Sequence, residues 1–131
     1  MENAQDSDTI YSLAMIHKDS KNYEKASDYL KQVTTLDIQN ANVWKELSEC
    51  YIQMGKYEKS MDCIRRSLKI NPKQPKAVFN MGICYQETNQ YDKALDFYQK
   101  AINIDPQKFK SFHNMGLIYY YSNDYEKAIE I

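Results

Sequence analysis

One short phrase recurs along this chain at a fixed interval. It is YEKA at residues 23–26, YEKS at 57–60, YDKA at 91–94 and YEKA at 125–128, so its start moves by 34 residues each time. A period of this length is the signature of a repeat protein, in which stacked units bury one another's apolar faces. The period predicts a disordered tail at 1–6 and units at 7–40, 41–74, 75–108 and, incomplete, 109–131.

The first half of each unit predicts an amphipathic helix. Apolar residues recur in the fourth, seventh and eleventh columns of the aligned units, and offsets of three, four and seven place them on one helix face. The eighth column always holds a small residue, which suits a close approach of two helix backbones. A later column favours Gly and Asn, which tolerate the left-handed geometry that ends a helix. The eighth column holds Ala14, Ser48, Gly82 and Gly116, and the later one holds Lys21, Gly55, Asn89 and Asn123.

The repeated phrase predicts the start of a second helix. Its acidic residue falls in the first turn, where a carboxylate favours the positive end of the helix dipole. The sequences NP at 71–72 and DP at 105–106 then end the helix, because the residue before a proline avoids helical geometry. Ile38 stands at that place in the first unit, so the end of its second helix is less sharply defined. Each unit is therefore predicted to be a helix hairpin.

These columns resemble the tetratricopeptide repeat (TPR) family over residues 7–131. The resemblance implies an all-α fold, a single right-handed superhelical solenoid of about three and a half antiparallel helix hairpins. The last helix stops after about two turns, too short to be stable alone, so we expect the array to continue beyond Ile131. The second unit carries the family pattern at Trp44, Leu47, Tyr51 and Pro72, and the third carries it at Gly82, Tyr85, Ala94, Tyr98, Ala101 and Pro106.

Composition argues against several other classes of protein. With only 3 Gly and 3 Pro among 131 residues, the chain has room for long helices and disfavours a turn-rich β sandwich. A net charge of −1 gives no basis for electrostatic capture of nucleic acid. No apolar run approaches the roughly 20 residues of a membrane helix, and the polar start MENAQDSDTI differs from a secretory signal. We therefore expect a cytoplasmic protein that neither binds nucleic acid nor inserts into a membrane.

The sequence contains no recognisable catalytic or metal motif. Glycine-rich phosphate-binding loops and the HExxH zinc motif are both absent. His17 occupies a column that otherwise holds tyrosine, which predicts a structural role for it. Cys50, Cys63 and Cys84 lack CxxC spacing and are expected to be small buried residues. We expect no enzyme activity, no cofactor and no bound metal ion.

The TPR resemblance implies a binding groove for a protein or peptide partner. First helices of the family line a concave surface and present their second, fifth, sixth, ninth, twelfth and thirteenth positions. Amides at Asn80 and Asn114 can bond a peptide backbone, and Phe79 can anchor an apolar side chain, so we expect all three to face solvent. In the first two units these positions include Tyr11, Lys18, Asn42, Lys45, Glu46 and Glu49. The predicted groove comprises Lys45, Lys76, Phe79, Asn80, Ile83, Lys110, His113, Asn114, Leu117, Tyr120 and Tyr121.

The expected function is that of a non-catalytic interaction scaffold within a multiprotein assembly, and two alternatives stay open. One is a chaperone adaptor, which clamps a C-terminal carboxylate with lysines and asparagines. Lys45, Asn80 and Lys110 match that clamp, whereas Glu49 stands where an asparagine is needed. The other is the substrate-recruiting arm of a larger enzyme, such as a glycosyltransferase or phosphatase.

Overall fold

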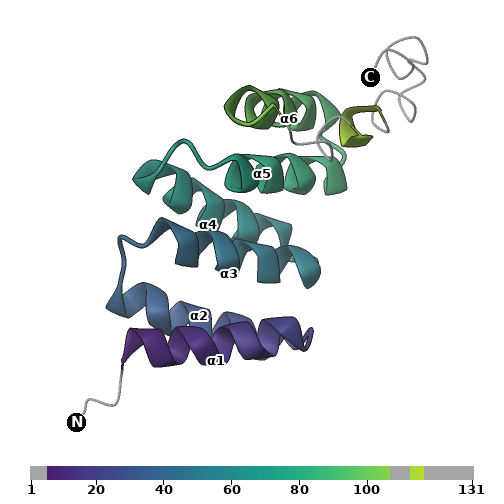
Figure 1. Ribbon diagram of the computed structural model, residues 1–131. Helices are drawn as coiled ribbons and strands as arrows, with labels where there is room; N and C mark the ends of the chain where they lie inside the picture. Colours follow the sequence, from purple (N-terminus) through teal and green to yellow (C-terminus); the bar gives the residue numbers. More distant parts are fainter. Residues whose placement is uncertain (1–5, 107–112, 117–131) are drawn as a thin grey trace. The chain divides into compact units, whose positions relative to one another are not determined.

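Helices occupy the chain at the intervals that the sequence predicts. The computed structural model describes residues 6–106 and 113–116, and no strand occurs among them. First helices begin at residues 7, 41 and 75 and second helices at 23, 57 and 91, which confirms the predicted hairpins (Figure 1). The helices are α1 (Ser7–Asp19), α2 (Tyr23–Leu36), α3 (Ala41–Gln53), α4 (Tyr57–Ile70), α5 (Pro75–Glu87) and α6 (Tyr91–Ile104), and residues 113–116 are also helical.

The chain divides into two compact parts, Met1–Pro72 and Lys73–Ile131. In the first part α1 packs against α2, α2 against α3 and α3 against α4, so two hairpins stack in sequence (Figure 1). In the second part α5 packs against α6. Residues 1–5 of the predicted tail and most of the unit at 109–131 lie outside the described residues. Asp6 caps α1, because its carboxylate accepts a hydrogen bond of 3.1 Å from the backbone N–H of Asp8.

The turn inside each hairpin has the same geometry in all three described repeats. Lys21, Gly55 and Asn89 adopt φ values of 63°, 74° and 62°, which confirms the left-handed helix ends. The residue after each of them donates its backbone N–H five residues back, and all three of these hydrogen bonds are 2.8 Å long. This is the Schellman closure of a helix. The pairs are Asn22 with His17, Lys56 with Tyr51 and Gln90 with Tyr85.

The core of the first part is a single apolar cluster drawn from all four of its helices. Each aliphatic side chain buried there stabilises the fold by roughly 1.5–3 kcal/mol. His17 is half-buried and stacks on the ring of Tyr29 with centroids 5.6 Å apart, in line with its predicted structural role. The buried cluster comprises Ile10, Ala14, Ala26, Leu30, Val33, Val43, Leu47, Cys50, Tyr51 and Cys63.

One apolar column differs between the first two repeats. Leu47 is 2% exposed, whereas Leu13, at the same place one repeat earlier, is 39% exposed. The reason is that α3 packs against the preceding α2, while only Asp6 precedes α1 among the described residues. Ile16, one turn further along α1, is 59% exposed. The helix pattern is thus regular, but burial of its face depends on a preceding hairpin.

Two serine hydroxyls of α4 donate hydrogen bonds to backbone carbonyls of α3. Ser60 Oγ donates to the carbonyl of Ser48 at 2.9 Å, and Ser67 Oγ donates to the carbonyl of Ala41 at 2.8 Å. Ser48, Ser60 and Ser67 are all 0% exposed, so these bonds satisfy hydroxyls that water cannot reach. Serine in these small-residue positions therefore keeps the helices close and adds polar contacts to the α3–α4 interface.

In the second part, the small eighth column is explained by one aromatic side chain. A Cβ atom added to Gly82 would lie 2.5 Å from Cε1 of Tyr98, closer than side-chain carbons approach. The Tyr98 side chain is 0% exposed, and its hydroxyl donates to Gln86 Oε1 at 2.6 Å. The same hydroxyl accepts a hydrogen bond of 3.2 Å from Asn114 Nδ2. The ring is therefore held in place, and only glycine fits beneath it.

We predict that Gly82→Ala destabilises the protein even though alanine favours helix formation. Overpacking against a fixed ring costs about 1–3 kcal/mol, which exceeds the gain in helix propensity of about 1 kcal/mol. Urea denaturation followed by circular dichroism measures the change. Tyr98→Leu makes room for the new methyl group, so the loss from Gly82→Ala should shrink in that background. Equal losses in the two backgrounds would show that the Tyr98 ring is not the cause.

We predict that Lys21→Gly stabilises the protein. A lysine held at φ 63° has a left-handed backbone that costs a residue with a Cβ about 1–2 kcal/mol, and glycine removes most of that strain. The urea midpoint should rise, and Gly55→Ala, the reverse change at the equivalent turn, should lower it. A fall in the midpoint for Lys21→Gly would contradict the strain argument.

Candidate peptide-binding surface

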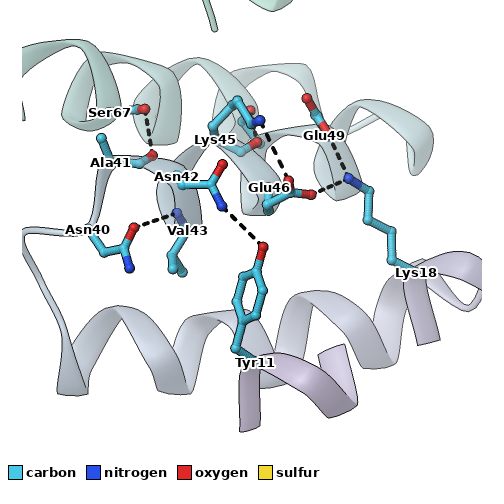
Figure 2. Close-up of polar contacts among 11 residues, drawn as sticks. Tyr11, Lys18, Asn40, Ala41, Asn42, Val43, Lys45, Glu46, Glu49 and Ser67 are labelled. Carbon is cyan, nitrogen blue, oxygen red and sulfur yellow. Dashed lines mark hydrogen bonds and ion pairs between the residues drawn. The ribbon is translucent and has the colours of Figure 1, made fainter. Parts of the chain in front are cut away.

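Two first helices of the N-terminal part, α1 and α3, are joined by polar side chains at the predicted groove positions (Figure 2). Asn42 Nδ2 donates to the hydroxyl of Tyr11 at 3.1 Å. Lys18 Nζ donates to Glu49 Oε1 at 2.6 Å and also bonds Glu46. We call this set the α1–α3 surface: Tyr11, Lys18, Asn42, Lys45, Glu46 and Glu49.

The charges of the α1–α3 surface form a partly buried cluster. The side chains of Lys18, Glu46 and Glu49 are 22%, 13% and 16% exposed. Burial alone would lower the pKa of Lys18, but the hydrogen bonds to Glu46 and Glu49 outweigh it and raise the pKa. Lys45 Nζ lies 3.6 Å from Glu46 Oε2. The positive charges of Lys18 and Lys45 thus offset the negative charges of Glu46 and Glu49 within the protein.

A cleft of about 210 Å³ lies at the Tyr11 end of this surface. The residues that line it include two carboxylates, four side-chain groups that can both donate and accept hydrogen bonds, and two valines. None of these lining residues is a lysine or an arginine, so the cleft suits a neutral or basic group. They are Ser7, Asp8, Tyr11, Val33, Asp37, Asn40, Asn42 and Val43.

The expectation that Phe79 and the two asparagines face solvent is wrong. Phe79 is 5% exposed and packs on Tyr98, with ring centroids 5.5 Å apart. Asn80 is only 2% exposed. Asn114 is half-buried and donates to the Tyr98 hydroxyl. Phe79 and Asn114 are shielded from solvent because both contact the large side chain of Tyr98, Phe79 through its ring and Asn114 through a hydrogen bond. Truncating Phe79 should therefore lower stability as well as any binding.

The remaining predicted groove residues divide between described and undescribed segments. Lys76 is half-buried, with its ammonium 5.6 Å from the centroid of the Phe79 ring. Ile83 is half-buried and His113 is exposed. Lys110, Leu117, Tyr120 and Tyr121 lie outside the described residues.

The three cysteines are buried and suited to packing. Cys50 and Cys84 are 0% exposed and Cys63 is 7% exposed, which confirms the prediction. Burial raises the pKa of the Cys50 thiol to about 11 and that of Cys63 to about 12. Protonated, inaccessible thiols are poor nucleophiles and poor metal ligands. Over the described residues, no group of three or more His, Cys, Asp or Glu side chains is placed to hold a metal ion.

Sequence reasoning missed the pairing of Lys18 with Glu46 and Glu49. A repeat column describes one helix face, whereas the ammonium of Lys18 and the two carboxylates meet across two repeats. Opposite charges at groove positions of neighbouring first helices were the available signal.

No helix in the described part is long and apolar enough to cross a bilayer.

Comparisons with known proteins identify the family and support the fold. The family model of the tetratricopeptide repeat protein 21 C-terminal ARM domain matches residues 1–131. No curated protein matches the chain. The crystal structure of MamA is similar with a TM-score of 0.91 and 22% identity, covering 98% of this chain and 75% of that one.

Two further solved structures are described by their peptides or peptide sites. The first TPR of Spaghetti (RPAP3) bound to the HSP90 peptide SRMEEVD has a TM-score of 0.86 and 14% identity, covering 92% of this chain and 96% of that one. YrrB, described as a TPR protein with an unusual peptide-binding site, has a TM-score of 0.84 and 20% identity, covering 98% of this chain and 66% of that one. At these identities the likeness establishes the fold.

We predict that Lys18→Met destabilises the first part by about 1–3 kcal/mol. The change leaves two partly buried carboxylates without their shared cation, and an uncompensated buried charge costs more than the intact pair contributes. Urea denaturation measures the loss. Lys25→Met, which removes an exposed lysine of α2, is the control and should change stability by only a few tenths of a kcal/mol. Equal effects of the two substitutions would show that the cluster does not hold α1 to α3.

Proposed function

Since this chain belongs to the family of the tetratricopeptide repeat protein 21 C-terminal ARM domain, we propose that it is a non-catalytic interaction scaffold. It binds a peptide or a helix of a protein partner on the face that its first helices present. In the N-terminal part that face is the α1–α3 surface with the adjoining cleft.

The observation that carries the proposal is the convergence of groove-position side chains from two repeats. Asn42 and Tyr11 bond each other across α1 and α3, beside a cleft of about 210 Å³. An amide and a phenol offer both donors and acceptors, which is what an extended peptide backbone requires. Two structures of the same fold carry descriptions that name a peptide or a peptide site, which favours the same class of ligand here.

The charge balance favours one kind of peptide over another. A carboxylate clamp requires cations that can turn to the ligand, but the clamp residue Lys45 lies 3.6 Å from Glu46. Asn80, another clamp residue, is only 2% exposed. The cleft beside Tyr11 instead carries Asp8 and Asp37. We therefore favour a neutral or basic peptide over the acidic C-terminus that a chaperone adaptor would bind.

A peptide-display selection on the whole chain tests the proposal. The selection should yield neutral or basic peptides, and Asn42→Ala or Tyr11→Phe should weaken these peptides about 3–10-fold, the usual cost of one neutral hydrogen bond. Titration calorimetry measures the affinities. Asp28→Ala, an exposed change on the second helix α2, is the matched control and should leave binding unchanged.

Two outcomes would contradict the proposal. One is selection of acidic peptides whose binding is abolished by Lys45→Ala, which would support the carboxylate clamp. The other is that Asn42→Ala and Tyr11→Phe are silent, which would exclude the α1–α3 surface. Circular dichroism on each variant checks that the helices remain intact.

A further inference from the structure

A second cleft of the N-terminal part lies outside the predicted groove. It has a volume of about 340 Å³ and is formed by the loop between α2 and α3, the start of α3 and the end of α4. We call it the Trp44 cleft. It is lined by Ile38, Gln39, Trp44, Arg66, Lys69 and Ile70.

The Trp44 cleft has a built framework. Trp44 Nε1 donates to the carbonyl of Ile38 at 2.9 Å, which fixes the loop against α3. The guanidinium of Arg66 lies over the Trp44 ring, 5.0 Å from its centroid. This cation–π contact holds Arg66 against Trp44 and does not use the N–H donors of the guanidinium. The site is therefore preorganised on two helices.

The chemistry of the cleft is both cationic and apolar. Arg66 and Lys69 are exposed, and none of the described residues that line the cleft is acidic. The nearby Asp37 lines the other cleft, where Asn40 Nδ2 bonds its carboxylate at 3.1 Å. Ile38 is 53% exposed and Ile70 is half-buried, so an apolar wall lies beside the two cations. A pair of cations beside an apolar wall complements a ligand that carries both negative charge and a hydrophobic group.

These residues depart from the rest of the repeat array. Trp44 is the only tryptophan of the chain, and Arg66 is one of its two arginines. One repeat later, proline stands where Ile38 is, and valine stands where Trp44 is. One repeat earlier, Gln32 and Thr35 replace Arg66 and Lys69. Trp44 belongs to the repeat pattern, but the periodic fold does not require Ile38, Arg66 and Lys69, so their coincidence at one cleft points to recognition.

We propose that the Trp44 cleft binds a short acidic peptide segment of a protein partner. Carboxylates of the segment bond Arg66 and Lys69, and a neighbouring aliphatic or aromatic side chain packs on Ile38 and Ile70. Charge complementarity argues for this occupant, because paired cations without a lining acid attract anions, and the apolar wall favours a peptide over a fully polar anion. The site is independent of the α1–α3 surface and has the opposite charge preference.

Trp44 itself supplies the measurement. Because it is the only tryptophan, its intrinsic fluorescence reports on this cleft alone. The probe is a blocked hexapeptide, DELFDE, with the neutral NQLFNQ and the basic KKLFKK as comparisons. DELFDE should change Trp44 emission saturably and lose affinity as salt rises, whereas the neutral and basic peptides should not saturate. Anisotropy of a labelled copy gives an independent affinity.

Substitutions locate the site. Arg66→Gln and Lys69→Gln should each weaken DELFDE roughly tenfold, as expected for loss of a charge-assisted hydrogen bond. Arg65→Gln is the matched control, because Arg65 precedes Arg66 on α4 but pairs with Asp62 at 3.0 Å outside the cleft. It removes the same charge and should leave binding within about twofold. Asn42→Ala should also have no effect, which separates this site from the α1–α3 surface.

The proposal is overturned by any of three results. They are the absence of saturable binding up to about 1 mM DELFDE, equal losses for Arg65→Gln and Arg66→Gln, and equally tight binding of a uridine hexanucleotide. The second result would indicate diffuse attraction to α4, and the third would indicate a site for phosphate groups. Unchanged circular dichroism of the variants ensures that lost binding does not reflect unfolding.

Discussion

The close contact between the two helices of each repeat is the constraint on which the rest of the structure depends. The eighth position of the first helix must be small because a large side chain of the second helix occupies the space above it. In the third repeat this side chain is Tyr98, and Gly82 leaves the room that its ring needs. Equivalent places hold Ala14 with Leu30 and Ser48 with Ile64, all buried. The bulkiest of these second-helix residues, Tyr98, thus faces the smallest first-helix residue, Gly82.

On α1 and α3, the groove positions carry polar side chains that meet across the two helices. Within the N-terminal part, the α2–α3 loop separates two clefts of opposite character. Asp37 and Asn40 line one cleft, and Ile38 and Gln39 line the other. Of these four consecutive loop residues, the outer two line the acidic cleft and the inner two line the basic cleft. A short loop fixed by Trp44 and by the cap at Asn40 thus contributes to two clefts of different charge.

The sequence was sufficient to predict the helices, because turns and small residues repeat at fixed columns. It identified the left-handed turn residues, even at Lys21, where the residue type is unfavourable. It failed for Phe79 and Asn114, because their environment depends on Tyr98, a residue of another helix whose size differs between repeats. It also missed the Lys18 cluster and the Trp44 cleft. Both arise between repeats, where long side chains meet across helices, and alignment of repeats onto one another does not reveal such contacts.

The Lys18 cluster has a consequence for how a ligand is chosen. A partner that reaches the α1–α3 surface meets groups that are already bonded to one another. Each charged contact that it forms there must replace an internal one, so the net gain is the difference between two similar energies. Total affinity then stays low, while discrimination between similar ligands is retained, since a poorly matched group loses the internal bond and gains nothing. If a peptide binds the α1–α3 surface as proposed, it is selected by exchange of charged contacts and is released readily when the internal pairs re-form.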